Sequence, residues 1–189
     1  MTVLAVSTHG NVYLMAAAFA NSATFQGVVG AGDETQALEH IHYPDVHFED
    51  DEDGKPAMYC DLMPPRIVIP YELGDHELGD GVVAPFRVAE SFTCIFDFVA
   101  PDDIAAEGRK NSFGWFHDKV WNILKEIRDL GRTGQVTGTS VAYPAIRATR
   151  VIEGPYLMDI AEQSIRAEDS PEAGVPQHVW HTSYEIEWG

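Results

Sequence analysis

The stretch VWHTSYEIEW, Val179 to Trp188, alternates bulky apolar and polar side chains along its length. Trp180 and Ile186 fall on one face of an extended chain, whereas His181 and Glu185 fall on the other. Alternation with a period of two is typical of a strand that buries one face against a core. The sequence therefore predicts that this stretch is a strand held in a sheet.

Three other segments carry strand patterns, and one carries a helix pattern. The expected strands are RIVIPYEL (66–73), SFTCIFDFV (91–99) and AIRATRVI (145–152). The clearest helix lies between the last two, in residues 116–130, where apolar side chains recur three or four positions apart. The members of this stripe are Phe116, Val120, Ile123, Leu124, Ile127 and Leu130.

The expected order of elements is helix, strand, strand, helix, strand, strand, with the first helix running from Asn11 to about Phe25. This order suits the α+β class, with a four-stranded, mainly antiparallel sheet that carries the helices on one face. Residues 1–189 are expected to form a single domain. Its long inserted loops or arms are an acidic irregular loop at 33–63, a hairpin arm at 74–90 and a long connection at 153–178.

The charge balance excludes one large class of partners. The chain has 30 acidic residues against 12 Lys and Arg, which gives a formal net charge of −18. Binding to a phosphate backbone depends on clustered cations, so specific binding to nucleic acid is not expected.

Two cysteines imply no disulfide framework. No apolar run approaches the ~18 residues of a membrane span, and the first basic residue, Lys55, comes too late for a signal peptide.

Ligand-type side chains are densest in HIHYPDVHFEDDEDG, residues 40–54. His40, His42 and His47 could share a transition metal, which leaves open a small metal- or ligand-binding α+β domain. An EF-hand reading fails, because its twelfth position is Cys60 where a glutamate is required. We expect no resident metal or other cofactor. An acidic, solvated surface is expected at Glu49, Asp50, Asp51, Glu52 and Asp53.

No catalytic constellation is recognisable in the sequence. It contains no Gly-x-Ser-x-Gly turn, and Cys94 shares a strand face with Phe92 and Phe96, as a core thiol would. No nucleophile, base and orienting partner fall in a known arrangement. The sequence therefore predicts that the protein is not an enzyme and has no catalytic residues.

Two apolar features are unusual for a monomer. Ile95 and Val99 lie on the face of strand 91–99 that should meet solvent, and the arm carries further apolar side chains. Exposed apolar side chains on a sheet face suggest a partner surface, although the connection 153–178 could also cover them. The expected subunit interface comprises Val82, Val83, Phe86, Ile95 and Val99.

The layout resembles that of the tail terminator and head-to-tail joining proteins of long-tailed bacteriophages. The resemblance covers roughly half to two-thirds of the chain. The segments that carry it are PPRIVIPYEL (64–73), SFTCIFDFVAP (91–101), FHDKVWNILKEIRDL (116–130), AIRATRVI (145–152) and VWHTSYEIEW (179–188). The acidic stretch, the arm after Leu73, the loop after Pro101 and the long connection exceed a compact member of that group.

This resemblance implies a structural virion protein that is assembled in the bacterial host cytoplasm. Such a protein forms a ring, commonly a hexamer, at the end of the tail tube and joins the tail to the head. Its expected partners are the tail tube protein and the head connector or neck proteins. DNA would pass through the ring without specific binding, because an acidic lumen repels phosphates.

Overall fold

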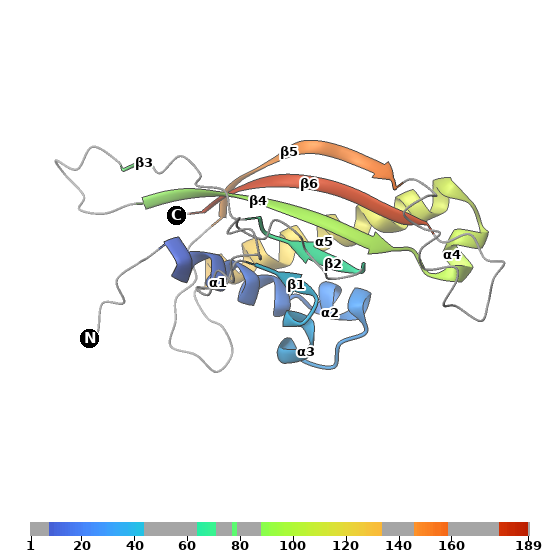
Figure 1. Ribbon diagram of the computed structural model, residues 1–189, viewed down its shortest axis with the longest axis horizontal. Coiled ribbons are helices and arrows are strands. Elements are labelled where there is room, and N and C mark those ends of the chain that lie inside the picture. Colours follow the sequence, from blue (N-terminus) through green and yellow to red (C-terminus); the bar gives the residue numbers. More distant parts are fainter. Residues whose placement is uncertain are drawn as a thin grey trace, which may run out of the picture.

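The computed structural model describes residues 8–43, 64–70, 77–78, 88–133, 146–158 and 178–188. The elements in these ranges pack as one sheet with helices on one face, which confirms the predicted α+β class (Figure 1). In chain order they are α1 (Thr8–Ala20), α2 (Ala23–Val29), α3 (Glu34–Leu38), β1 (Ile41–His42), β2 (Arg66–Val68), β3 (Glu77–Leu78), β4 (Val88–Val99), α4 (Asp102–Ala106), α5 (Arg109–Thr133), β5 (Ile146–Leu157) and β6 (Val179–Trp188).

The sheet has the strand order β1-β2-β4-β6-β5, and β3 pairs with the start of β4. Its centre is the antiparallel ladder of β4 and β6, which runs from the pair Glu90 and Trp188 to the pair Val99 and Val179. The four predicted strands correspond to β2, β4, β5 and β6. The short β1 pairs with β2 in parallel, so the sheet is mixed and has one more strand along its path than predicted.

Aromatic side chains fill the space between sheet and helices. Phe96 and Phe98 of β4 point toward the helices, and Phe96 meets Phe19 of α1 with ring centroids 5.6 Å apart. Phe98 meets Phe25 of α2 at 6.2 Å and Phe116 of α5 at 5.8 Å. The predicted stripe on α5 is buried from Phe116 to Ile127. The core therefore lies where the sequence pattern places it.

The predicted first helix is wrong, because two helices replace it. α1 ends at Ala20, and Ser22 starts α2 as its cap, with Ser22 Oγ accepting a hydrogen bond from the Phe25 backbone N–H at 3.0 Å. The break turns the chain by 75° and buries both Phe19 and Phe25. No single helix in the described ranges is long and apolar enough to cross a membrane, although α1 and α2 together reach that length and composition.

The predicted irregular loop at 33–63 is wrong for its first third. Asp33 caps α3 by accepting a hydrogen bond from the Gln36 backbone N–H at 2.9 Å, and Ala37 is buried. β1 follows, and the backbone carbonyls of His40 and His42 accept hydrogen bonds from the amides of Ile67 and Ile69. The Asp33 cap and the buried side chains of Ala37 and Ile41 help to order this polar segment. The remainder of the loop, 44–63, lies outside the described residues.

The helices and strands after residue 100 also differ from the predicted boundaries. Residues 102–106 form α4, and α5 is longer at both ends than the predicted 116–130. β5 continues to Leu157, five residues beyond the predicted end, because three register shifts against β6 allow the strand to pass Gly154 and Pro155. Bulges of this kind accommodate a proline that cannot donate a ladder hydrogen bond. The predicted connection therefore begins later than residue 153.

Candidate functional site

A buried charge network lies on the sheet face that is turned away from the helices. Because Phe96 and Phe98 point toward the helices, Asp97 between them points to the opposite face. The register places Asp97 directly opposite Arg66 on β2 and opposite His181 on β6. Its carboxylate is 1% exposed and accepts hydrogen bonds from Arg66 Nε at 2.7 Å and from His181 Nδ1 at 2.6 Å.

The network continues from His181 to the edge strand β5. His181 Nε2 lies 3.5 Å from Glu153 Oε2, and the Tyr156 ring lies against the imidazole with centroids 4.8 Å apart. Burial alone would lower the pKa of His181, but the hydrogen bond and charge of Asp97 and the charge of Glu153 raise it above its ordinary value of 6.5. The positive form of His181 therefore bridges two carboxylates.

This arrangement is suited to holding strands together. An Asp–His pair can also orient a catalytic base. Here, however, Nε2 faces Glu153 and the Tyr156 ring rather than a hydroxyl or thiol. Residues Arg66, Asp97, His181 and Glu153 come from four different strands, so their contacts fix the register across most of the sheet. Sequence analysis missed this network. Its only signal in the sequence is that Asp97 places a carboxylate between Ile95 and Val99 on the outer face of β4.

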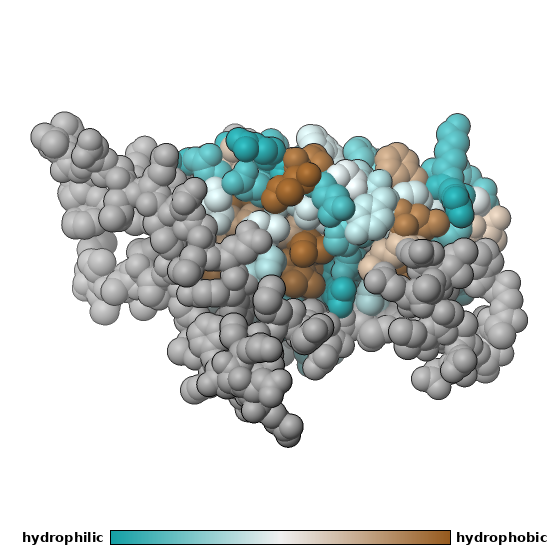
Figure 2. Space-filling model, turned by 45° about the horizontal axis from the view of Figure 1, so that its top comes forward, coloured by the Kyte–Doolittle hydropathy of each residue, from teal (hydrophilic) through white to brown (hydrophobic). Residues whose placement is uncertain are grey.

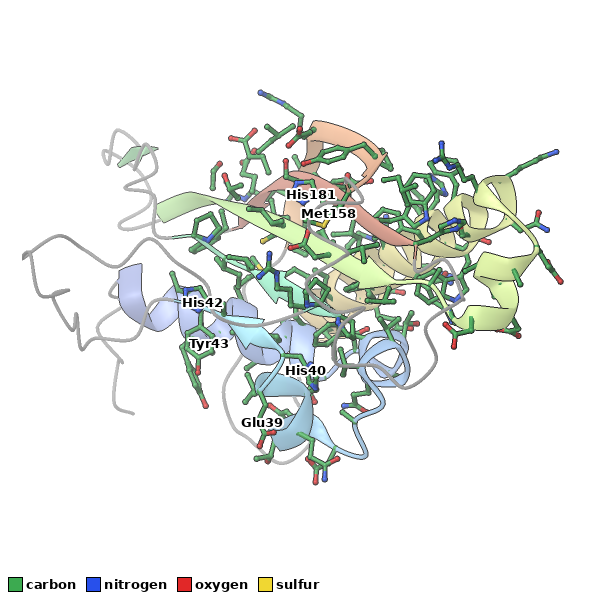
Figure 3. All side chains as sticks on the ribbon, turned by 45° about the vertical axis from the view of Figure 1, so that its right-hand side comes forward. Glu39, His40, His42, Tyr43, Met158 and His181 are labelled. Carbon is green, nitrogen blue, oxygen red and sulfur yellow. The ribbon has the colours of Figure 1, made fainter. Side chains whose placement is uncertain are left out.

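The histidines proposed as metal ligands do not form a metal site in the described part of the chain. His40 Nδ1 lies 3.1 Å from the Pro65 carbonyl oxygen and donates to it. His42 is half-buried on β1. Figure 3 shows His40, His42 and Tyr43 near β1, apart from His181 and Met158 near β5 and β6. Among the residues that the structure describes, no three His, Cys, Asp or Glu side chains could hold one metal ion. His47 and the acid run Glu49 to Asp53 lie outside those residues.

A serine and a histidine meet where α5 begins, but they are not arranged for catalysis. Ser112 Oγ lies 2.8 Å from His178 Nδ1, donates to the Arg109 carbonyl oxygen and accepts from Trp180 Nε1. The Ser112 hydroxyl has a single proton, so it can donate to only one of its two neighbouring acceptors, the Arg109 carbonyl oxygen or His178 Nδ1, at a time. Ser112 is also fully buried. The contact therefore fastens α5 to the start of β6.

Two further reactive groups also serve the packing. Burial raises the pKa of the Cys94 thiol, which is fully buried in the core as predicted. Glu126 on α5 accepts hydrogen bonds from Ser22 Oγ at 2.6 Å, from the Thr24 backbone N–H at 3.1 Å and from Thr24 Oγ1. Although burial alone would raise the pKa of Glu126, these bonds lower it. The carboxylate thus ties α5 to the N-terminal turn of α2.

Only two of the five predicted interface residues, Ile95 and Val99, belong to the described part of the chain. Ile95 and Val99 lie on the outer face, as expected, but both are half-buried rather than exposed, because β2 and β6 flank this part of β4. Val99 ends β4 beside an open hollow of about 490 Å³. Val82, Val83 and Phe86 lie outside the described residues.

The hollow beside Val99 has a lining of mixed chemistry. Its apolar lining comes from separate elements and comprises Val28, Pro65, Val99, Pro101 and Trp115. Asp102 and Lys119 add one negative and one positive side chain. Both Val99 and Trp115 are half-buried, so apolar surface is accessible in it.

The edge strand β5 carries exposed apolar side chains that sequence analysis did not single out. Val151, Ile152 and Tyr156 are 51%, 55% and 43% exposed. Figure 2 shows the side on which β5 and β6 lie, where hydrophobic patches alternate with hydrophilic ones. Edge strands with exposed apolar groups are typical sites of association between chains.

A second apolar surface lies on α5. Trp121 is 61% exposed and Phe113 is 39% exposed, although the other side of the helix is buried in the core. Lys125 and Arg128 follow on the same exposed side. The described residues thus combine a well-packed core with two separate groups of exposed apolar side chains and a hollow. Comparison with protein-family models, with curated proteins and with solved structures gives no match for this chain.

Proposed function

We propose that the protein is a structural virion protein that forms a ring at the end of a phage tail tube and joins tail to head, as a tail terminator or neck protein. The observation that carries this proposal is the pair of different apolar surfaces, on β5 and on α5. Two different surfaces suit heterologous contacts, in which each copy binds the next one head to tail. Such contacts close into rings when the rotation between neighbours is right.

The reactive side chains of the described part support a structural role over an enzymatic one. Ser112, Cys94 and Asp97 are buried, and Glu126 is half-buried and held by three hydrogen bonds. Each is engaged in packing or in ties between elements. A catalytic group must reach substrate, so these positions favour stability of the scaffold.

The charge of the chain supports the passage of DNA through such a ring. A net charge of −18 gives a repulsive field toward phosphates, so a genome could move through the lumen without adhering. The acid run Glu49 to Asp53 is our candidate for the lumen surface. The partners in this proposal are a homo-hexameric ring, the tail tube protein and the head connector or neck proteins, within the virion.

The mass in solution tests this proposal directly. Light scattering is expected to give a mass several times the 20.9 kDa of one chain, alone or after addition of tail tube protein. Negative-stain images of the same sample should show rings with a central opening. A monomer at high concentration, with no ring in the presence of tail tube or connector proteins, would contradict the proposal.

A further inference from the structure

We propose that the hollow at the end of β4 is a socket that receives residues 82–86 of a neighbouring copy of the chain. The socket is defined by Val28, Pro65, Val99, Pro101 and Trp115, with Asp102 and Lys119 in its lining. The proposal rests on the proposed function, because it adds a contact between neighbouring copies in the ring to those on β5 and α5. It goes further by naming the donor segment, the acceptor and the direction of the contact.

The socket has the size of a site for a short segment, and its lining is partly apolar and partly polar. Its volume of about 490 Å³ falls within the ~300–1,000 Å³ of typical ligand pockets. Apolar side chains from α2, β4 and α5 line it, together with two prolines. One acid and one base stand among them. A fitting occupant therefore combines apolar side chains with one charge of each sign.

Residues 80–87 of the chain have this composition. The sequence DGVVAPFR places Val82, Val83 and Phe86 between Asp80 and Arg87. Arg87 matches Asp102 of the socket, and Asp80 matches Lys119. Pro85 restricts the backbone before binding, which lowers the entropy that the segment loses when it docks.

The topology requires that the occupant come from another copy. Leu78 of β3 pairs with Val88 at the start of β4, so residues 79–87 connect these two strands. Val99 in the socket is at the other end of the 12-residue β4. At ~3.3 Å per residue, the two ends lie about 36 Å apart. Figure 1 shows β3 and α4 at opposite ends of the molecule.

The reach of the segment is too short for its own socket. From Val88, a fully extended chain brings Phe86 at most about 7 Å and Val82 at most about 21 Å along the strand. Both distances fall well below the length of β4. Each copy would therefore give its segment to one neighbour and receive a segment from the other, which is the heterologous pattern of a ring.

Cysteine cross-linking of the full chain tests the contact. In a Cys60→Ser background, one chain carries Phe86→Cys and a second, larger tagged chain carries Val99→Cys. Cys94 stays in place because it is fully buried. Oxidation of the mixture is expected to give a reducible heterodimer, and the double variant in a single chain is expected to give a ladder of covalent oligomers.

A matched control uses Ser140→Cys in place of Phe86→Cys. Ser140 lies in the connection between α5 and β5, and β5 begins at the same end of the sheet as β4. It should give no heterodimer with Val99→Cys. Charge reversal adds a second readout: Arg87→Glu or Asp102→Lys alone should weaken association about fivefold, and the two together should restore it.

The outcomes separate this proposal from the proposed function. If the unmodified chain forms rings but Phe86→Cys and Val99→Cys cross-link no better than the Ser140→Cys control, the socket is wrong and the ring stands. If the unmodified chain stays monomeric with tail tube protein and no cross-link forms, both proposals fail. A heterodimer together with charge-reversal rescue supports the socket.

Discussion

Replacing Asp97 with Asn should destabilise the fold by about 3–5 kcal/mol, the range for breaking a buried ion pair. The Asp97 carboxylate accepts two charge-assisted hydrogen bonds, from Arg66 Nε and from His181 Nδ1. Each such bond contributes about 1.5–3 kcal/mol. Asn keeps one carbonyl oxygen, but its amide nitrogen must then face the second donor.

Urea denaturation followed by tryptophan fluorescence measures this loss at a fixed chain concentration. The midpoint should fall while the slope of the transition stays the same. Asp103→Asn is the matched control, because Asp103 is exposed and its loss should change stability by less than about 0.5 kcal/mol. Combining Asp97→Asn with His181→Gln should cost less than the sum of the two single variants, since the new amide at position 181 can present its carbonyl oxygen to the new amide at position 97.

A small effect would refute the reasoning about this network. If Asp97→Asn lowers stability by less than about 1 kcal/mol, the carboxylate is not the desolvated centre that its 1% exposure and two short hydrogen bonds indicate. Full additivity with His181→Gln would also show that the two side chains are not coupled.

Three other results follow from the structure. Leu124→Ala should lower the free energy of unfolding by about 2–5 kcal/mol, because Leu124 is buried on α5. Lys125→Ala should change it little, because Lys125 is exposed. Equal urea midpoints for the two variants would show that the buried face of α5 is wrongly assigned. The pKa of His181 is raised in the fold, so its contribution to stability should be complete below pH ~6.5 and decline as pH rises through the folded pKa. His181→Gln should remove that part of the pH dependence, and a profile unchanged by the substitution would contradict it. Ile152→Asp on β5 should lower the mass of the assembly without changing the melting temperature of the monomer. Thr149→Asp, which is also exposed on β5, is the control for an added charge. Rings that persist in Ile152→Asp would exclude β5 as a contact.

The sequence was most informative where an element is long enough for its buried side chains to recur with a fixed period. The alternation in β4 and β6 and the stripe on α5 predicted which faces form the core, because burial of large side chains imposes a fixed period on each element. The break between α1 and α2 was missed, since the apolar pattern continues through it and only Ser22 marks a new cap. Short elements such as α3 and β1 were missed because a few residues carry too little periodicity.

The candidate site could be predicted only in part. Val99 was singled out from its face, but the hollow beside it gathers residues from α2, β4 and α5 that lie far apart in the sequence. The Asp97 network likewise depends on strand register, which pairs Arg66 and His181 with the same carboxylate. Register between distant strands follows from the whole sheet, so a single segment does not reveal it.

The charge network and the socket are connected through β4. Asp97 is two residues from Val99, so the ties from Arg66 and His181 hold the end of the strand that forms one wall of the socket. The network is neutral when His181 is protonated, because two positive groups, Arg66 and His181, offset the carboxylates of Asp97 and Glu153. A neutral cluster is less costly to bury than a single charge. Residues 82–86, the proposed donor segment, immediately precede β4 in the sequence, so in the proposed ring this strand links the donor of each copy to its socket. A ring requires a constant separation between donor and socket, because every copy must repeat the same step for the last to meet the first.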